Sequence, residues 1–97
     1  MTVGFHPEAE AEFLDSIAYY DECSPGLGDT FRVAVDNAVR QVLSAPHRWP
    51  VHYRRVRRCL VHRFPYGVLY GMGTERIFVL AIMNLHRHPD YWKHRMS

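Results

Sequence analysis

The sequence predicts an α+β fold in which a two-helix N-terminal hairpin packs on a small, mainly antiparallel sheet of three to four strands. Apolar residues recur at helical spacing as far as residue 45, and β-rich runs replace them from residue 56 onward. A tight turn separates the last two of these runs. The 97 residues are 47% hydrophobic and 13% aromatic, which is enough for the core of a single domain spanning residues 1–97.

The first 46 residues contain the two predicted helices. In HPEAEAEFLDSIAYYDEC, Pro7 suits the first helical turn, and the glutamates that follow it lie where the helix dipole favours anions. The stretch SPGLGD then ends one helix and starts the next. Apolar residues repeat every three to four positions through DTFRVAVDNAVRQVL until Pro46 ends the second helix. The short connection predicts that the two helices are antiparallel.

The second half of the chain contains the predicted strands VRRCLVHRF, YGVLYGM and RIFVLAIMNL. The last run is apolar on both faces, so we expect it near the centre of the sheet, covered by the helix pair. A short strand at Thr2–Phe5 is expected to join the sheet. Alternation alone leaves open whether Phe64, Tyr66 and Tyr70 pack in the core or face a partner.

Charge divides the chain into two halves. Residues 1–46 carry two cations and eight anions, which gives 2 − 8 = −6, whereas residues 47–97 carry ten cations and two anions, which gives 10 − 2 = +8. This asymmetry indicates that the second half faces an anionic partner, such as nucleic acid or an acidic protein. No apolar run is long enough to span a membrane and no signal peptide is evident, so we expect a cytoplasmic protein with Cys23 and Cys59 reduced.

The arginine-rich stretch RRVRR, residues 54–58, lies at the start of a predicted strand. Arginine binds phosphate and carboxylate groups well because its planar guanidinium can donate two hydrogen bonds at once. Three interpretations stay open at this point. The stretch is a solvated edge strand protected from aggregation by its charge, a docking site for an acidic protein segment, or a nucleic-acid contact.

The stretch MNLHRHPDYWKHR, residues 83–95, crowds imidazoles, cations and rings together where the last strand ends at Pro89. His86 can transfer protons near neutral pH, Arg87 can stabilise phosphate charge, and Tyr91 or Trp92 can stack a base. These are the parts that RNA cleavage needs, although a structural role for His86 is an equal alternative. The histidines lack a third ligand nearby, so no metal site is expected.

Four stretches carry a resemblance to the RelE/ParE toxin superfamily, in its plasmid-stabilisation branch: FHPEAEAEFLDSIAYYDECSPGLGDTF, APHRWPV, RRCLVHRFPYGVLY and NLHRHPDYW. The resemblance covers essentially the whole chain in the same order. It implies two N-terminal helices on a small antiparallel sheet. It also implies a growth-inhibiting toxin of a type II toxin–antitoxin system, neutralised by a cognate antitoxin that binds it.

The resemblance leaves the target open between DNA gyrase, which ParE-like members poison, and ribosome-bound mRNA, which RelE-like members cleave. Arg58, Arg87 and Tyr91 fall on positions that match basic and C-terminal residues of cleaving members. Many cleaving members also carry an arginine just after the aromatic residue that matches Tyr66, where this chain has Gly67. Both targets therefore stay open, as does a degenerate toxin with neither activity.

If the chain cleaves RNA, we expect Arg58, Arg63 and Arg87 to hold the phosphate. His86 or Tyr91 would transfer the protons, and the chain would be a ribosome-dependent endoribonuclease without metal or organic cofactor. Two readings outside the toxin class are a non-catalytic nucleic-acid-binding module and a partner protein whose basic face binds an acidic peptide.

Overall fold

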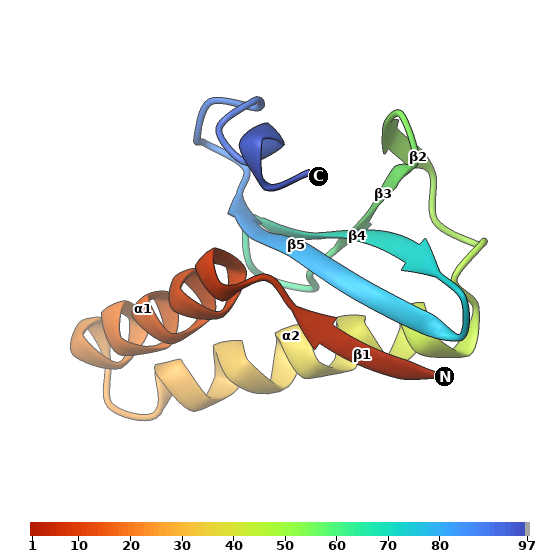
Figure 1. Cartoon of the computed structure of the whole chain (residues 1–97). Helices are drawn as coiled ribbons and strands as arrows, with labels where there is room; N and C mark the ends of the chain where they lie inside the picture. The colour runs from red at the N-terminus through yellow and green to blue at the C-terminus, as the bar shows by residue number, and fades with distance from the viewer. Residues whose placement is uncertain (97) are drawn as a thin grey trace.

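The computed structural model describes residues 1–96 and confirms the predicted α+β class. Strand β1 (Thr2–Phe5) leads into helices α1 (Pro7–Cys23) and α2 (Leu27–Ser44), which lie side by side under one face of a sheet (Figure 1). The sheet is completed by β2 (Val51–Tyr53), β3 (Val56–Leu60), β4 (Tyr66–Gly73) and β5 (Arg76–Asn84). A short 3₁₀ helix, η1 (Lys93–Arg95), follows. None of the described helices is sufficiently long and apolar to cross a bilayer.

The helical hairpin forms where the sequence signals place it. The His6 ring accepts a hydrogen bond from the Glu8 amide at 3.1 Å, and Pro7 opens α1 without leaving a helical donor unpaired. Gly26, with a φ of 88°, allows the sharp entry into α2, since this backbone conformation favours glycine. The free thiols of Cys23 and Cys59 lie on the surface and in the core respectively, so they do not form a disulfide.

The sheet has five strands in the order β1-β5-β4-β3-β2, one or two more than predicted. Three of its pairings are antiparallel, and the fourth joins β1 to β5 in parallel, with Phe5 opposite Val79. The additional strand β2 has three residues beside Pro50, which is too short to give an alternating pattern. As predicted, β5 is an inner strand.

The main core lies between the helices and the sheet. Phe31 and Val35 of α2 are fully buried there, together with Tyr70 of β4 and Ile77 of β5. Tyr66 is also buried, and its ring packs edge-on to Phe31 with centroids 4.8 Å apart. These tyrosines therefore belong to the core. Phe64 and Trp49 are partly buried and pack against the same cluster. The other partly buried apolar residues that surround the cluster are Phe5, Phe13, Ile17, Tyr20, Ala34, Leu43 and Met72.

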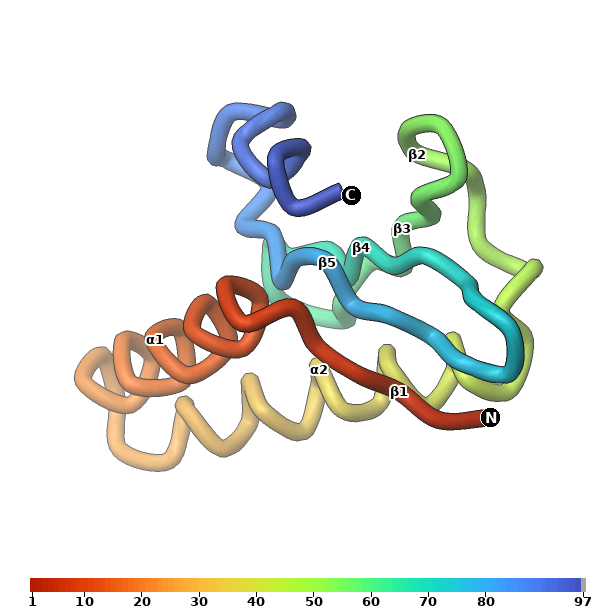
Figure 2. Tube along the Cα trace, viewed as in Figure 1, coloured from red at the N-terminus to blue at the C-terminus, as the bar shows by residue number. Residues whose placement is uncertain are grey.

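A second apolar cluster covers the opposite face of the sheet, which we call the outer face. Leu69 of β4 and Ala81 of β5 pack there against Trp92, which is fully buried. Trp92 belongs to the segment of residues 85–96, which leaves β5 and folds back above the sheet (Figure 2). The helices thus cover one apolar face of β5, and this C-terminal segment covers the other.

Tyr70 links the stability of this core to alkaline pH. Burial, with Cys59 adding to it and Arg57 opposing it, raises the pKa of Tyr70 to about 12, and its hydroxyl donates to the Pro46 carbonyl at 2.7 Å. Because the pKa is higher in the folded state, stability is fully present below pH 10 and is lost as the pH rises toward 12.

We therefore expect Tyr70→Phe to lower the free energy of unfolding by about 1–2 kcal/mol at pH 7 and to flatten its decline above pH 10. Urea unfolding followed by circular dichroism at pH 7, 10 and 11 would measure both effects. Equal alkaline declines in the wild type and the variant would show that the Tyr70 hydroxyl does not cause this loss.

Candidate functional site

The C-terminal segment that carries the predicted site residues is held in shape by local hydrogen bonds. The Asn84 side chain accepts from the His86 amide at 2.9 Å, and the His88 ring accepts from the Asp90 amide at 3.1 Å. The indole of Trp92 donates to the Pro89 carbonyl at 2.8 Å. Pro89 cannot continue a strand, so the chain turns here and directs Trp92 down onto the outer face.

A carboxylate of α1, Glu12, anchors this segment. Arg95 donates to both of its oxygens, at 2.7 and 3.1 Å, and the Tyr91 hydroxyl donates to Oε2 at 2.5 Å. The side chains of Arg95 and Glu12 are only 5% and 14% exposed. A bidentate arginine–carboxylate pair in such a dry setting is strong and directional. Sequence reasoning missed Glu12 because three alternating glutamates at a helix start are explained by the helix dipole alone.

The same pair also satisfies backbone groups of β5 that lack a strand partner. Strand β1 ends opposite Val79, and a bulge follows, because Leu69 pairs with Ala81 while Tyr70 pairs with Val79. Beyond it, the amide of Ile82 donates to Glu12 at 3.2 Å. Arg95 donates in turn to the Leu80 carbonyl at 3.0 Å. The ion pair therefore completes this edge of the sheet as well as fixing the segment.

Arg87 and Tyr91 are the two predicted site residues that lie in contact. The Arg87 guanidinium carbon lies 3.9 Å from the centre of the Tyr91 ring, and its Nη1 is 3.8 Å from Glu12. The Arg87 side chain is 56% exposed. Burial and then the bond to Glu12 raise the pKa of the Tyr91 hydroxyl. This hydroxyl consequently keeps its proton near neutral pH, which disfavours it as a general base.

Arg58 lies on the outer face of β3, opposite Leu69. Its methylene stem crosses Gly67, where an added Cβ would meet the Arg58 Cγ and Cδ at 3.0 Å. The stem thus occupies the space that any side chain at position 67 would need. Burial, Arg58 and then Lys93 lower the pKa of the neighbouring His52, which indicates a positive local potential.

The other two predicted site residues lie apart from this contact. Arg63 is in the loop between β3 and β4, has a left-handed φ of 74°, and lines a groove beside α2. His86 is exposed in the turn after β5, where its amide donates to Asn84. Among residues 1–96, no three histidine, cysteine or acidic side chains are grouped closely enough to hold a metal ion.

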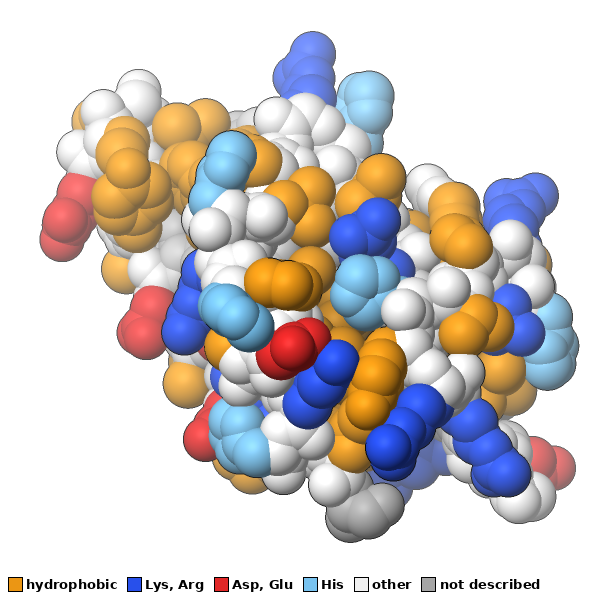
Figure 3. All heavy atoms as spheres, turned by 90° about the horizontal axis from the view of Figure 1, so that it is seen from above, with side chains coloured by type: hydrophobic (Ala, Val, Ile, Leu, Met, Phe, Trp, Pro, Cys, Tyr) orange, Lys and Arg blue, Asp and Glu red, His pale blue; other side chains and the backbone are white. Residues whose placement is uncertain are grey.

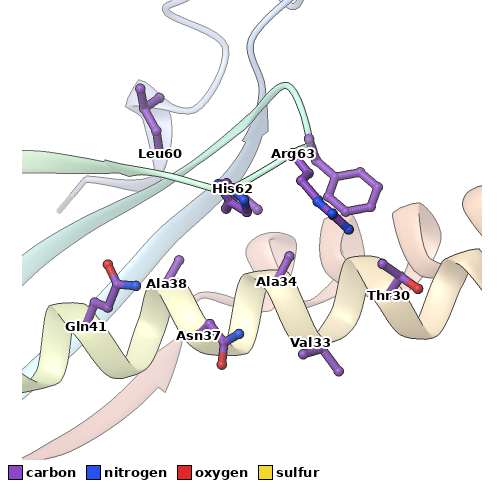
Figure 4. A pocket seen from close by; sticks show the side chains of 11 residues that line it. Thr30, Val33, Ala34, Asn37, Ala38, Gln41, Leu60, His62 and Arg63 are labelled. Atoms are coloured by element: carbon purple, nitrogen blue, oxygen red, sulfur yellow. The ribbon is translucent and has the colours of Figure 1, made fainter.

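A groove beside α2 has a volume of about 700 Å³ (Figure 4). Ala34 and Ala38 of α2 form part of one wall, and Leu60 and Arg63 contribute to the other. Strand β2 pairs with β3 only opposite Val56 and Arg57, and the Arg58 amide donates to the Pro50 carbonyl at 3.2 Å. No described strand therefore covers the outer edge of β3 at Cys59 and Leu60. An extended peptide could add to such an open edge.

A smaller hollow of about 210 Å³ lies between α1 and the ends of β4 and β5. It is lined by both Arg87 and Tyr91, together with Asp15, Ser16 and Asn84. Its volume is below that of ordinary ligand pockets, which argues against a site for a large cofactor.

Comparison with known proteins shows a clear likeness to a solved structure. No model of a protein family and no curated protein matches the sequence. The structure, however, is similar to a solved chain described as "Chromosomal ParDE TA system from P. aeruginosa", with a TM-score of 0.78 and 16% sequence identity. The match covers 89% of this chain and 97% of that chain. At this level of identity the likeness concerns the fold, and the chain therefore has the RelE/ParE-like fold that its sequence predicts.

Proposed function

We propose that this protein is the toxin of a type II toxin–antitoxin system and that it inhibits growth by acting on DNA gyrase. The toxin class is supported by the fold shared with a chain of a ParDE system, together with the motifs RFPYGVLY and HRHPDYW. Gyrase rather than mRNA is supported by one observation: the Tyr91 hydroxyl is bound to Glu12, which also pairs with the buried Arg95. A tyrosine hydroxyl bound in this way stabilises the fold and is not free to transfer a proton to or from RNA.

The distribution of the other proposed catalytic residues also argues against RNA cleavage. Arg63 lines the groove beside α2, whereas Arg87 lines the small hollow near α1. General acid–base catalysis and charge stabilisation require groups that converge on one reacting phosphate. Arg58 and Arg87 remain available to bind an anion, but cations without a positioned base do not suffice for cleavage.

A cognate antitoxin has a suitable docking surface in the groove beside α2. Leu60 is 55% exposed and Val33 is 42% exposed at this groove, although both are apolar. The open edge of β3 offers backbone hydrogen bonds, and Arg63 offers a charge for an acidic side chain. We propose that an extended, apolar and acidic segment of the antitoxin binds here.

The proposal is tested by two assays on the purified protein. We expect the wild type to inhibit supercoiling by gyrase and to leave mRNA on programmed ribosomes intact. Equimolar antitoxin should restore supercoiling. Cleaved message in the wild type that disappears in Arg87→Ala would instead establish a ribosome-dependent nuclease with Arg87 in its site.

The proposed antitoxin site is tested with a matched pair of variants. Leu60→Asp should make the antitoxin at least about tenfold less effective, because a carboxylate would be placed against the apolar segment in the groove. Leu14→Asp is the control, since Leu14 is 58% exposed on α1 outside the groove. Equal effects of both substitutions would exclude the groove as the antitoxin site.

A further inference from the structure

The hairpin formed by β2 and β3 carries basic residues that neither the core nor the Glu12 cluster uses. Its strands pair Tyr53 with Val56, so Arg54 and Arg55 form a two-residue loop at the tip. Both are exposed, and Arg58 follows on the outer face of β3. In Figure 1 this hairpin rises from the sheet on the side away from the helices. The loop is thus presented to the solvent on a projecting two-stranded ribbon.

These arginines lack neutralising partners in the described part of the chain. No carboxylate among residues 1–96 forms an ion pair with Arg54, Arg55 or Arg58. Figure 3 looks onto this side of the molecule, where blue and pale-blue spheres are widespread and red ones are few. Acidic residues concentrate instead on the two helices: Glu8, Glu10, Glu12, Asp15, Asp21, Glu22, Asp29 and Asp36. The molecule therefore has a positive end at the hairpin.

Arg54 of the loop lies at a position whose backbone conformation favours glycine. Arg54 has a φ of 51°, in the left-handed region that side chains other than those of glycine and asparagine adopt at a cost. Two-residue hairpin loops usually place glycine or asparagine at such positions. The guanidinium of Arg54 lies over the Tyr53 ring at 5.2 Å, a weak contact at an exposed site. Arginine at position 54 therefore adds little to the stability of the loop. Contact of its guanidinium with an anion would explain why arginine is found here.

The aromatic rings around the hairpin are already occupied. The Lys93 ammonium lies 3.6 Å from the centre of the Tyr53 ring, and buried Trp92 packs edge-on to the same ring with centroids 6.0 Å apart. Tyr91 is covered by Arg87. The aromatic residue with a largely exposed ring among residues 1–96 is Tyr19, on α1. Proteins that bind single strands stack bases on free aromatic rings, so this surface suits a duplex better.

From these observations we infer that the β2–β3 hairpin binds the phosphate backbone of double-stranded DNA through Arg54, Arg55 and Arg58. A two-stranded ribbon fits the major groove, and arginines at its tip and flank can reach phosphates on both sides. Lys93 holds the hairpin against the C-terminal segment through Tyr53. The inference goes beyond the proposed action on gyrase and does not require it.

Fluorescence anisotropy of the full chain with a labelled duplex of about 20 base pairs tests the inference. Three phosphate contacts predict that the Kd rises about 40-fold between 50 and 200 mM NaCl. Arg55→Glu should raise the Kd at 50 mM NaCl by at least about tenfold. Arg40→Glu changes the net charge equally on the exposed face of α2, and it should raise the Kd by less than about threefold.

Arg54→Gly separates binding from folding. This variant removes one cation and relieves the left-handed backbone, so it should unfold at the same temperature as the wild type or higher, yet lower the salt slope by about one. Equal weakening by Arg55→Glu and Arg40→Glu would overturn the inference, as would tighter binding to a single strand or to RNA of the same sequence. Neither gyrase nor ribosomes take part, so this measurement can fail while the proposed toxin activity stands.

Discussion

Glu12→Gln should lower the free energy of unfolding by about 3–5 kcal/mol. The substitution keeps the size of the side chain but removes the charge opposite Arg95, whose guanidinium is only 5% exposed. Arg95 would keep the half-exposed Glu8 carboxylate, 2.8 Å from its Nε, but would lose its buried anionic partner next to the Leu80 carbonyl. The amide group of glutamine would also face the donors of Arg95 or the Tyr91 hydroxyl. For a domain of this size the midpoint of thermal unfolding should fall by at least about 12 °C.

The control for this experiment is Glu10→Gln, because Glu10 is exposed two residues away on the same helix. Its effect should stay within about 0.5 kcal/mol. A double-mutant cycle with Arg95→Met would add a second check, since the double variant no longer buries a lone charge and should lose less than the sum of the two single variants. A loss under about 1 kcal/mol for Glu12→Gln would mean that water reaches the pair in solution.

Trp92→Ala should have an effect of similar size, about 3–5 kcal/mol, through a different mechanism. The Trp92 side chain is fully buried and is among the largest in the outer-face cluster, where it packs with Leu69, Leu80 and Met83. Removing the indole leaves a cavity and also deletes the hydrogen bond to Pro89. The part of the C-terminal segment around Trp92 should therefore leave the outer face, while Arg95 stays paired with Glu12.

Detachment can be measured separately from stability. Limited proteolysis with trypsin should cut Trp92→Ala after Arg87 or Lys93 under conditions that leave the wild type intact. Leu85→Ala serves as the control, because Leu85 lies in the same segment but is 39% exposed. If Trp92→Ala unfolds at the wild-type temperature and resists trypsin, Trp92 is not what holds the segment.

The sequence predicts the layers of this fold better than it predicts their attachments. Helical spacing and Pro7 locate α1, and the apolar run of β5 identifies an inner strand. Local periodicity reports which faces are apolar, yet it does not say what covers them. For β5 we expected the helix pair, and the structure adds the segment around Trp92 on the second face. Only one apolar side chain in that segment is fully buried, so no periodic signal marks it.

Some residues of the candidate site could be predicted from the sequence, and others could not. Arg87 and Tyr91 are close in sequence and lie in contact, as the crowding of residues 83–95 suggested. Glu12 is 83 positions from Arg95, and nothing in its own neighbourhood distinguishes it from Glu8 or Glu10. Pairing over such a distance depends on the tertiary fold. The stem of Arg58 over Gly67 is a further case, because the strand register alone sets these residues near each other.

The parallel pairing of β1 with β5 affects how the chain matures during synthesis. Residues Thr2–Phe5 leave the ribosome first, yet their partners Arg76–Val79 emerge only after both helices and three other strands. Until then the helical hairpin can form, but β1 has no neighbouring strand, and the carboxylate of Glu12 has no Arg95. A nascent chain stopped before β5 would therefore expose the apolar faces of its helices and be a substrate for chaperones and proteases. The parallel β1–β5 pairing and the Glu12–Arg95 ion pair thus form late in translation.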